Sequence, residues 1–137
     1  MRLISVYEIS LEAAATVLWD LLIERPEVAN ISHKAMPTWQ QHLDFIASRP
    51  YEGWYLIEVS GCGYVGAIYL TRQDEIGLGI LEAYQHQGHG SVAVQQLKTL
   101  HPRGRYLAHV APANLAGQRF WLKQGFKPIQ VTYDNQA

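Results

Sequence analysis

The seven residues 85–91 constrain the fold of this chain more than any other feature. They read Gln-His-Gln-Gly-His-Gly-Ser and stand between an apolar run at 76–81 and apolar residues at helical spacing over 92–100. Glycine permits a tight turn and a close approach of backbone to ligand. The first N–H groups of a helix lack intrahelical acceptors and lie at the positive end of its dipole. Strand, glycine turn and helix in this order therefore predict a site for a ligand that carries phosphate groups.

The glycine spacing argues against two common phosphate loops. No Gly-x-x-x-x-Gly-Lys-Ser/Thr segment occurs, so a triphosphate site of the Walker type is unsupported. The loop itself does not read Gly-x-Gly-x-x-Gly either, and it follows several predicted strands instead of opening a first βαβ unit. A phosphate site here would be a loop of another kind. The alternative is that the segment is only a turn that caps a helix.

The composition is typical of one globular domain spanning residues 1–137. The chain is 48% apolar and 17% charged, and it is long enough to bury a hydrophobic core. It shows neither the apolar core of a signal peptide nor a run long enough to cross a membrane, which predicts a cytoplasmic protein with no membrane partner. A net charge of -1 argues against nucleic acid as a partner. The single cysteine, Cys62, is expected in a hairpin turn.

Periodicity and turn signals predict alternating strands and helices. Ser10 is expected to cap a first helix that ends before Pro26, and Thr38 to cap a second. The second helix is expected over 39–48, a third over about 88–100, and a short fourth from Asn114 to near Gly125. Strands are expected at 2–7, 54–59, 64–71, 75–81, 106–110 and 126–133. This order describes an α/β fold, a mixed sheet with helices on both faces.

Two motifs in this order resemble the GNAT superfamily of acyl-CoA-dependent N-acetyltransferases. The first is Gln85-x-x-Gly88-x-Gly90, and the second runs from Asn114 through a short helix to Gly125-Phe126. The resemblance implies one GNAT-like domain, with a mostly antiparallel central sheet of six to seven strands and about four helices. It also implies acetyl-CoA as co-substrate.

The resemblance assigns coenzyme A contacts to three segments. The pyrophosphate is expected on Gln85, His86, Gln87, Gly88, His89, Gly90 and Ser91. The pantetheine arm is expected to pair with the backbone of Leu78, Gly79 and Ile80 like an added strand. The thioester end is expected near Asn114, Phe120 and Lys123. The alternative for Phe120 is a core position, and for Lys123 a solvated helix charge.

Direct acyl transfer requires an uncharged amine, and alkyl ammonium groups have a pKa near 10, so a base or a water chain must remove a proton. His109 and Glu75 are the proposed catalytic residues, and Glu82 is a third choice. Imidazole titrates near neutral pH, which favours His109, although a structural histidine is an equal alternative. Glu75 can equally be a solvated carboxylate at a strand end.

The usual general acid of the superfamily has no counterpart here. Many relatives carry a tyrosine four residues before the Gly-Phe pair, where this chain has Trp121, and an indole N–H cannot deliver a proton. Tyr84, Tyr133 or water are the alternatives. A covalent route through Cys62 is disfavoured by its expected turn location, so direct attack in a ternary complex is expected.

The resemblance implies that the first two helices, their connection and the hairpin form the acceptor side. The polar and aromatic groups available there are Ser32, His33, Trp39, His42, Trp54 and Tyr69. They favour a small-molecule amine or an amino-sugar over a basic peptide. A protein N-terminus or a lysine is an alternative acceptor, and a non-catalytic acyl-CoA-binding module is an alternative function. No metal is expected, because His86 and His89 lack further clustered ligands. The protein is expected to be a monomer or a homodimer.

Overall fold

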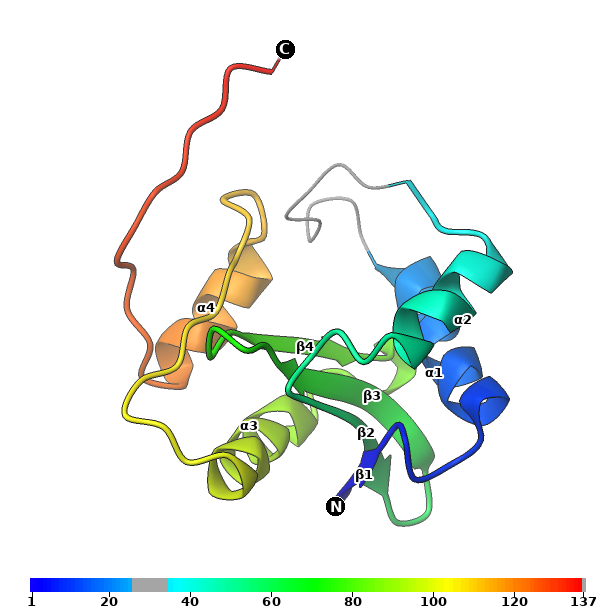
Figure 1. The fold of residues 1–137 in the computed structure, drawn as a ribbon. Coiled ribbons are helices and arrows are strands. Elements are labelled where there is room, and N and C mark those ends of the chain that lie inside the picture. The colour runs from blue at the N-terminus through cyan, green and yellow to red at the C-terminus, as the bar shows by residue number, and fades with distance from the viewer. Residues whose placement is uncertain (26–34, 137) are drawn as a thin grey trace.

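The computed structural model describes residues 1–25 and 35–136 (Figure 1). Its centre is an antiparallel sheet in the order β1-β2-β3-β4. The strands are β1 (Arg2–Ser5), β2 (Gly53–Val59), β3 (Gly63–Leu70) and β4 (Ile76–Ile80). The β2–β3 hairpin, with exposed Cys62 in its turn, agrees with the predicted one. The sheet therefore ends at β4, the strand that leads into the glycine segment.

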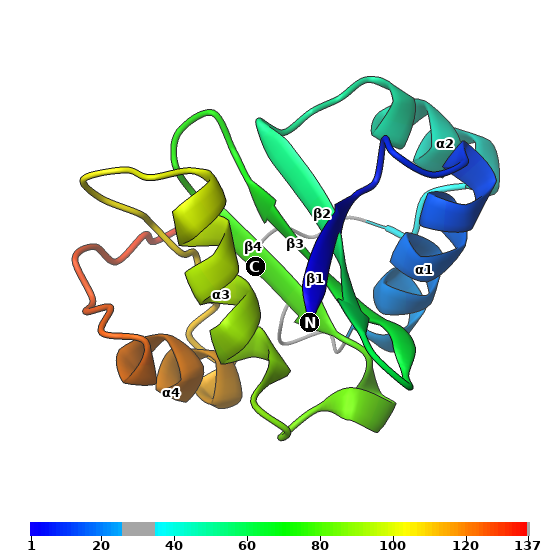
Figure 2. The same ribbon diagram turned by 90° about the horizontal axis from the view of Figure 1, so that it is seen from below.

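Helices cover both faces of this sheet, as predicted (Figure 2). They are α1 (Leu11–Glu24), α2 (Trp39–Ala47), the 3₁₀ turn η2 (Glu82–Tyr84), α3 (His89–Leu100) and α4 (Leu115–Lys123). Side chains cap three of them: Ser10 accepts from the N–H of Ala13, Thr38 from that of Gln41, and Asn114 from that of Gly117. These caps satisfy first-turn N–H groups, which is why the predicted starts are correct.

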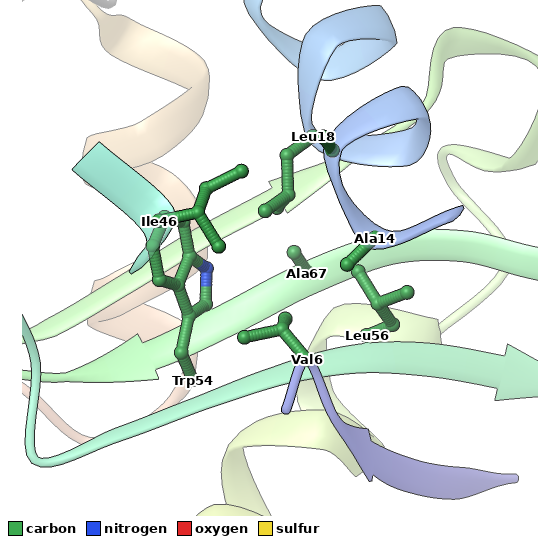
Figure 3. Packing of buried hydrophobic residues seen from close by; sticks show 8 residues of the cluster. Val6, Ala14, Leu18, Ile46, Trp54, Leu56 and Ala67 are labelled. Carbon is green, nitrogen blue, oxygen red and sulfur yellow. The ribbon is translucent and has the colours of Figure 1, made fainter. Parts of the chain in front are cut away.

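The side chains of each strand alternate between two hydrophobic cores. On one face Leu56 and Ala67 pack against Ala14 and Leu18 of α1 and Ile46 of α2 (Figure 3). The opposite face packs against α3, and its buried residues are Ile57, Val65, Ile68, Leu70, Ile76, Ala93, Val94 and Leu97. The sheet is thus a rigid central layer from which β4 presents one set of residues to each core.

The predicted count of six to seven strands is wrong, since the described residues contain four. Residues 106–110 make one isolated parallel bridge, Leu107 with Glu75, instead of a fifth strand. The predicted strand at 126–133 is absent, and the chain there runs away from the body of the molecule (Figure 1). Ile129 and Val131 alternate with polar residues as in a strand, but β structure needs a paired neighbour and none is formed there. Among the described residues, no helix combines the length and apolar character needed to cross a membrane.

Candidate active site

Strand β4 separates the two sides of the candidate site. Its residue Leu78 packs into the α3 core, whereas a β-carbon built at Gly79 would lie 3.4 Å from Leu21 of α1. Tyr69, which packs into the α1–α2 core, lies over Gly77. Alternation therefore assigns Glu75, Gly77 and Gly79 to the α1–α2 face.

Apart from one bridge, the outer edge of β4 has no paired strand among the described residues, and this unpaired edge is called the gap below. The N–H of Ile76 donates to the carbonyl of Leu107 at 2.8 Å, and the N–H of Leu107 donates to the carbonyl of Asp74 at 2.9 Å. In the part of the chain that the structure describes, residues 108–110 form no further bridge with β4. Because backbone groups of a strand alternate in direction, the N–H groups of Leu78 and Ile80 point the same way as that of Ile76, into this gap. An extended ligand can pair with them as a neighbouring strand does.

The glycine segment follows immediately and is tightly shaped. Gln85 donates its side-chain amide to the carbonyl of Ile80 at 2.9 Å, which ties the segment to the end of β4. His86 (φ 62°) and Gly88 (φ 83°) both lie in the left-handed region. Glycine accepts that conformation without strain, and histidine less readily. Two reversals of this kind turn the chain into the start of α3.

The start of α3 presents free N–H groups. The N–H of Val92 donates to the carbonyl of Gly88, so those of His89, Gly90 and Ser91 precede the first helical hydrogen bond. His89 contacts the side-chain oxygen of Gln87 at 3.3 Å through Nε2. Free N–H groups at a helix start can bind an anion, so the predicted pyrophosphate contacts at 85–91 stay a prediction that this backbone geometry allows.

Helix α4 packs beside this loop. A β-carbon built at Gly90 would lie 3.0 Å from the Phe120 ring and 3.1 Å from Leu78 Cδ2. Ser91 Oγ accepts a hydrogen bond from Gln124 at 2.8 Å. The structure thus brings Leu78, Gly90 and Phe120, three of the residues expected to contact coenzyme A, into one cluster.

Two other residues expected at the thioester end have different surroundings. Asn114 Oδ1 is engaged as the α4 cap, 3.0 Å from the N–H of Gly117. Lys123 is exposed at the last position of α4. Phe120 is half-buried and packs against the α3 core. It therefore has the packing role considered for it and also lies next to the loop.

Glu75 and His109, the two residues expected to be catalytic, contact each other. His109 Nε2 forms a hydrogen bond with Glu75 Oε2. The other carboxylate oxygen accepts from Thr71 Oγ1 at 3.1 Å. The side chains are 55% exposed for His109 and 26% for Glu75, so water and a small molecule can reach both. The arrangement can accept a proton from an amine and pass it to solvent.

An arginine that the sequence analysis did not single out holds the turn before Glu75. The guanidinium of Arg103 contacts Asp74 Oδ1 at 2.9 Å and Glu52 Oε1 at 2.8 Å. These two carboxylates raise the pKa of Arg103. No local pattern could have identified it, because its partners lie far away in sequence and meet it only in the folded chain.

The alternative acids and bases are spread over the molecule. Trp121 makes edge contacts with Phe120 (ring centroids 5.0 Å apart) and Phe126 (4.8 Å), which is a packing role. Tyr84 lies 3.5 Å from the carbonyl of Cys62, and the ring of Tyr133 is 88% exposed on the C-terminal segment. The backbone N–H of Glu82, the remaining base choice, donates to the carboxylate of Glu24 in α1.

The expected acceptor residues divide into three groups. Ser32 and His33 lie outside the described residues. His42 is buried, with Nε2 2.9 Å from the carbonyl of Ala15, and it contacts the rings of Trp39 and Trp19, which is a structural arrangement. Trp54 and Tyr69 form an aromatic cluster on the α1–α2 face of the sheet. Within the described ranges no group of three or more His, Cys, Asp or Glu side chains could hold a metal ion.

Comparison with known proteins gave a family and a fold. The sequence model of the acetyltransferase (GNAT) family matches residues 15–126. No curated protein matches the chain.

Several solved structures share the fold. One is a Streptococcus mutans protein at 17% identity and a TM-score of 0.68, with 93% of this chain and 84% of that one covered. Another is a GNAT-family acetyltransferase from Streptococcus pneumoniae at 16% identity and a TM-score of 0.59, with 94% of this chain and 93% of that one covered. A third, named as an acetyltransferase from Agrobacterium tumefaciens, has 14% identity and 0.62 over the full length of both chains.

Proposed function

From the premise that this chain belongs to the GNAT family of acetyltransferases, we propose that it acetylates a primary amine of a small molecule or amino-sugar, with acetyl-CoA as donor. The observation that carries this proposal is the arrangement around β4. A glycine loop at a helix start follows one end of the strand, and the Glu75–His109 pair lies at the other. The free strand edge connects the two, so a long ligand can reach both at once.

The residues around the gap fit coenzyme A. The N–H groups of His89, Gly90 and Ser91 suit a pyrophosphate, because helix N-termini bind anions through exposed donors and a positive dipole end. The N–H groups of Leu78 and Ile80 suit the amide-containing pantetheine arm. Acetyl-CoA supplies the thioester that is cleaved, and the protein supplies the groups that bind it and the group that accepts the proton.

In the proposed mechanism the Glu75–His109 pair removes a proton from the acceptor ammonium. The neutral amine attacks the thioester carbon, the new C–N bond forms, the C–S bond breaks with its electron pair on sulfur, and the second proton that the nitrogen loses ends on the thiolate. A thiol pKa of about 8.5 makes the thiolate an adequate leaving group without a strong acid. Water reaches the exposed His109 and carries the proton away. Direct attack in a ternary complex needs no nucleophilic side chain, so Cys62 has no role.

Two alternative functions can be tested by experiment. A module that binds acyl-CoA without turnover is favoured by one observation, namely that Trp121 packs against Phe120 and Phe126 where relatives carry a proton-donating tyrosine. Within the enzyme class, a protein N-terminus or a lysine is the alternative acceptor.

The test is release of free thiol from acetyl-CoA against a panel of amines, amino-sugars and peptides, with a reaction lacking acceptor as control. Release that depends on a small amine or amino-sugar supports the proposal. Release only with peptides supports the alternative acceptor, a protein N-terminus or a lysine. Tight binding of acetyl-CoA in calorimetry with no release across the panel favours the binding module.

A further inference from the structure

The ring of Tyr69 lies directly over β4 on the side where the acceptor is expected. Tyr69 of β3 is the cross-strand partner of Gly77. A β-carbon built at Gly77 would overlap the far end of the tyrosine, at Cζ and the hydroxyl oxygen. The phenol therefore needs a glycine beneath it, and its hydroxyl lies over β4 at Gly77.

The packing around Tyr69 holds this orientation. Its ring stacks on Tyr51, with centroids 4.0 Å apart and planes inclined by 5°. Trp54 approaches both rings edge-on, at centroid distances of 4.8 Å to Tyr51 and 6.5 Å to Tyr69. Held between Tyr51 and Gly77, the ring has little freedom to rotate, so its hydroxyl is preorganised.

The position of the hydroxyl matches the start of the gap. Gly77 is two residues beyond Glu75, whose bridge to Leu107 is the last pairing before the chains separate. Gly77 also lies on the same face of β4 as Glu75. A hydroxyl over Gly77 is therefore next to the proton-accepting pair and at the end of the gap remote from the glycine loop.

We propose that the Tyr69 hydroxyl donates a hydrogen bond to the carbonyl oxygen of the acetyl thioester. This inference rests on the proposed function, because it assigns a role within that site. As the amine attacks, negative charge grows on this oxygen, and a fixed donor stabilises the charge without reorganisation. Tyr69 is then a catalytic residue in place of the tyrosine missing at position 121, but it acts on the oxygen and not on the sulfur.

The decisive variant is Tyr69→Phe, which keeps the ring and removes the hydroxyl. The first measurement needs no acceptor: the infrared carbonyl stretch of acetyl-CoA labelled with ¹³C at the carbonyl and bound to the protein. With wild type the band is expected below its position for free acetyl-CoA, and with Tyr69→Phe it is expected to return toward that position. With an acceptor, kcat is expected to fall by about a hundredfold and the KM for acetyl-CoA to stay within about twofold.

Tyr64→Phe is the matched control, because Tyr64 is on the same strand and packs into the same core but lies beyond the part of β3 that pairs with β4. It is expected to leave the band and kcat unchanged. Gly77→Ala is a second variant that keeps the hydroxyl but displaces the ring, and it is expected to shift the band as Tyr69→Phe does. Thermal unfolding of each variant checks that it is folded.

The outcomes separate this inference from the proposed function. If acetyl-CoA binds with the same carbonyl band in wild type and Tyr69→Phe, the hydrogen bond is refuted and the transferase proposal stands. If wild type does not bind acetyl-CoA at all, the proposed function is overturned and the inference with it.

Discussion

His109 Nε2 and Glu75 Oε2 meet as a hydrogen-bonded pair although 34 positions separate the two residues in the chain. Glu75 precedes β4, and His109 lies just beyond Leu107, which bridges to Glu75 itself. Two residues that were expected to be rival bases are therefore partners. They share one hydrogen bond, so a change to either side chain also changes the surroundings of the other.

The pair is expected to behave as one unit in kinetics. Glu75→Gln and His109→Gln should each lower kcat by about a hundredfold or more, the usual effect of losing a general base. The double variant should be close to the more damaging single variant, because residues that act together are strongly non-additive. A double-mutant cycle on kcat measures this. Additive losses would show that only one of the two takes the proton.

Glu58→Gln is the control for that cycle. Glu58 also pairs with a cation, Arg2 at 2.8 Å, but at the opposite edge of the sheet from β4. Loss of the Glu58 carboxylate is expected to leave kcat unchanged. A fall in kcat in Glu75→Gln then reflects the place of Glu75 and not the loss of a carboxylate in general.

The glycine loop can be tested against a turn whose glycine has the same backbone conformation. Gly88 and Gly61 both have φ of 83° and open space where a β-carbon would stand. Alanine at either position should lower the free energy of unfolding by about 1–2 kcal/mol, the cost of a left-handed conformation with a side chain. Only Gly88→Ala should also weaken coenzyme A binding, because Gly88 shapes the turn into α3. Denaturant unfolding and calorimetry measure the two effects, and equal affinities in both variants would contradict the loop assignment.

Arg103 is expected to act as a positioning residue. Arg103→Ala removes the contact to Asp74, the residue before Glu75, together with the contact to Glu52. We expect kcat to fall several-fold while the KM for acetyl-CoA stays constant, because the carboxylate loses its fixed position but the glycine loop is untouched. Arg2→Ala, which breaks an exposed ion pair with Glu58, is the matched control and should have no effect. A rise in the KM for acetyl-CoA in Arg103→Ala would argue instead for general loosening of the fold.

Stability should fall in alkaline solution partly through Tyr51. Burial and the neighbouring Tyr69 raise the pKa of Tyr51 above its ordinary value of 10.0. The folded state then holds a proton that the unfolded chain has released, so this contribution is complete below pH 10 and is lost as pH rises toward the folded-state pKa. Denaturant unfolding between pH 9 and 12 should show a decline that is shallower in Tyr51→Phe. An identical decline in that variant would show that other groups cause it.

Local features of the fold were predictable because neighbouring residues decide them. Ser10, Thr38 and Asn114 each bond to an N–H three positions ahead, so the sequence alone marks these helix starts. The strands at 106–110 and 126–133 could not be judged in this way. Apolar alternation indicates which residues suit a strand, but a strand forms only beside a partner.

The sequence by itself determined the elements that depend on short-range chemistry: the capped helices, the β2–β3 hairpin and the turn from β4 through Gly88 into α3. Only the tertiary structure decided that Glu75 meets His109, that Arg103 holds Asp74 and that Tyr69 covers Gly77. The physical reason is that these contacts depend on which strands are neighbours and in which register. Those choices come from burying two cores on opposite faces of one sheet, and no single segment carries that information.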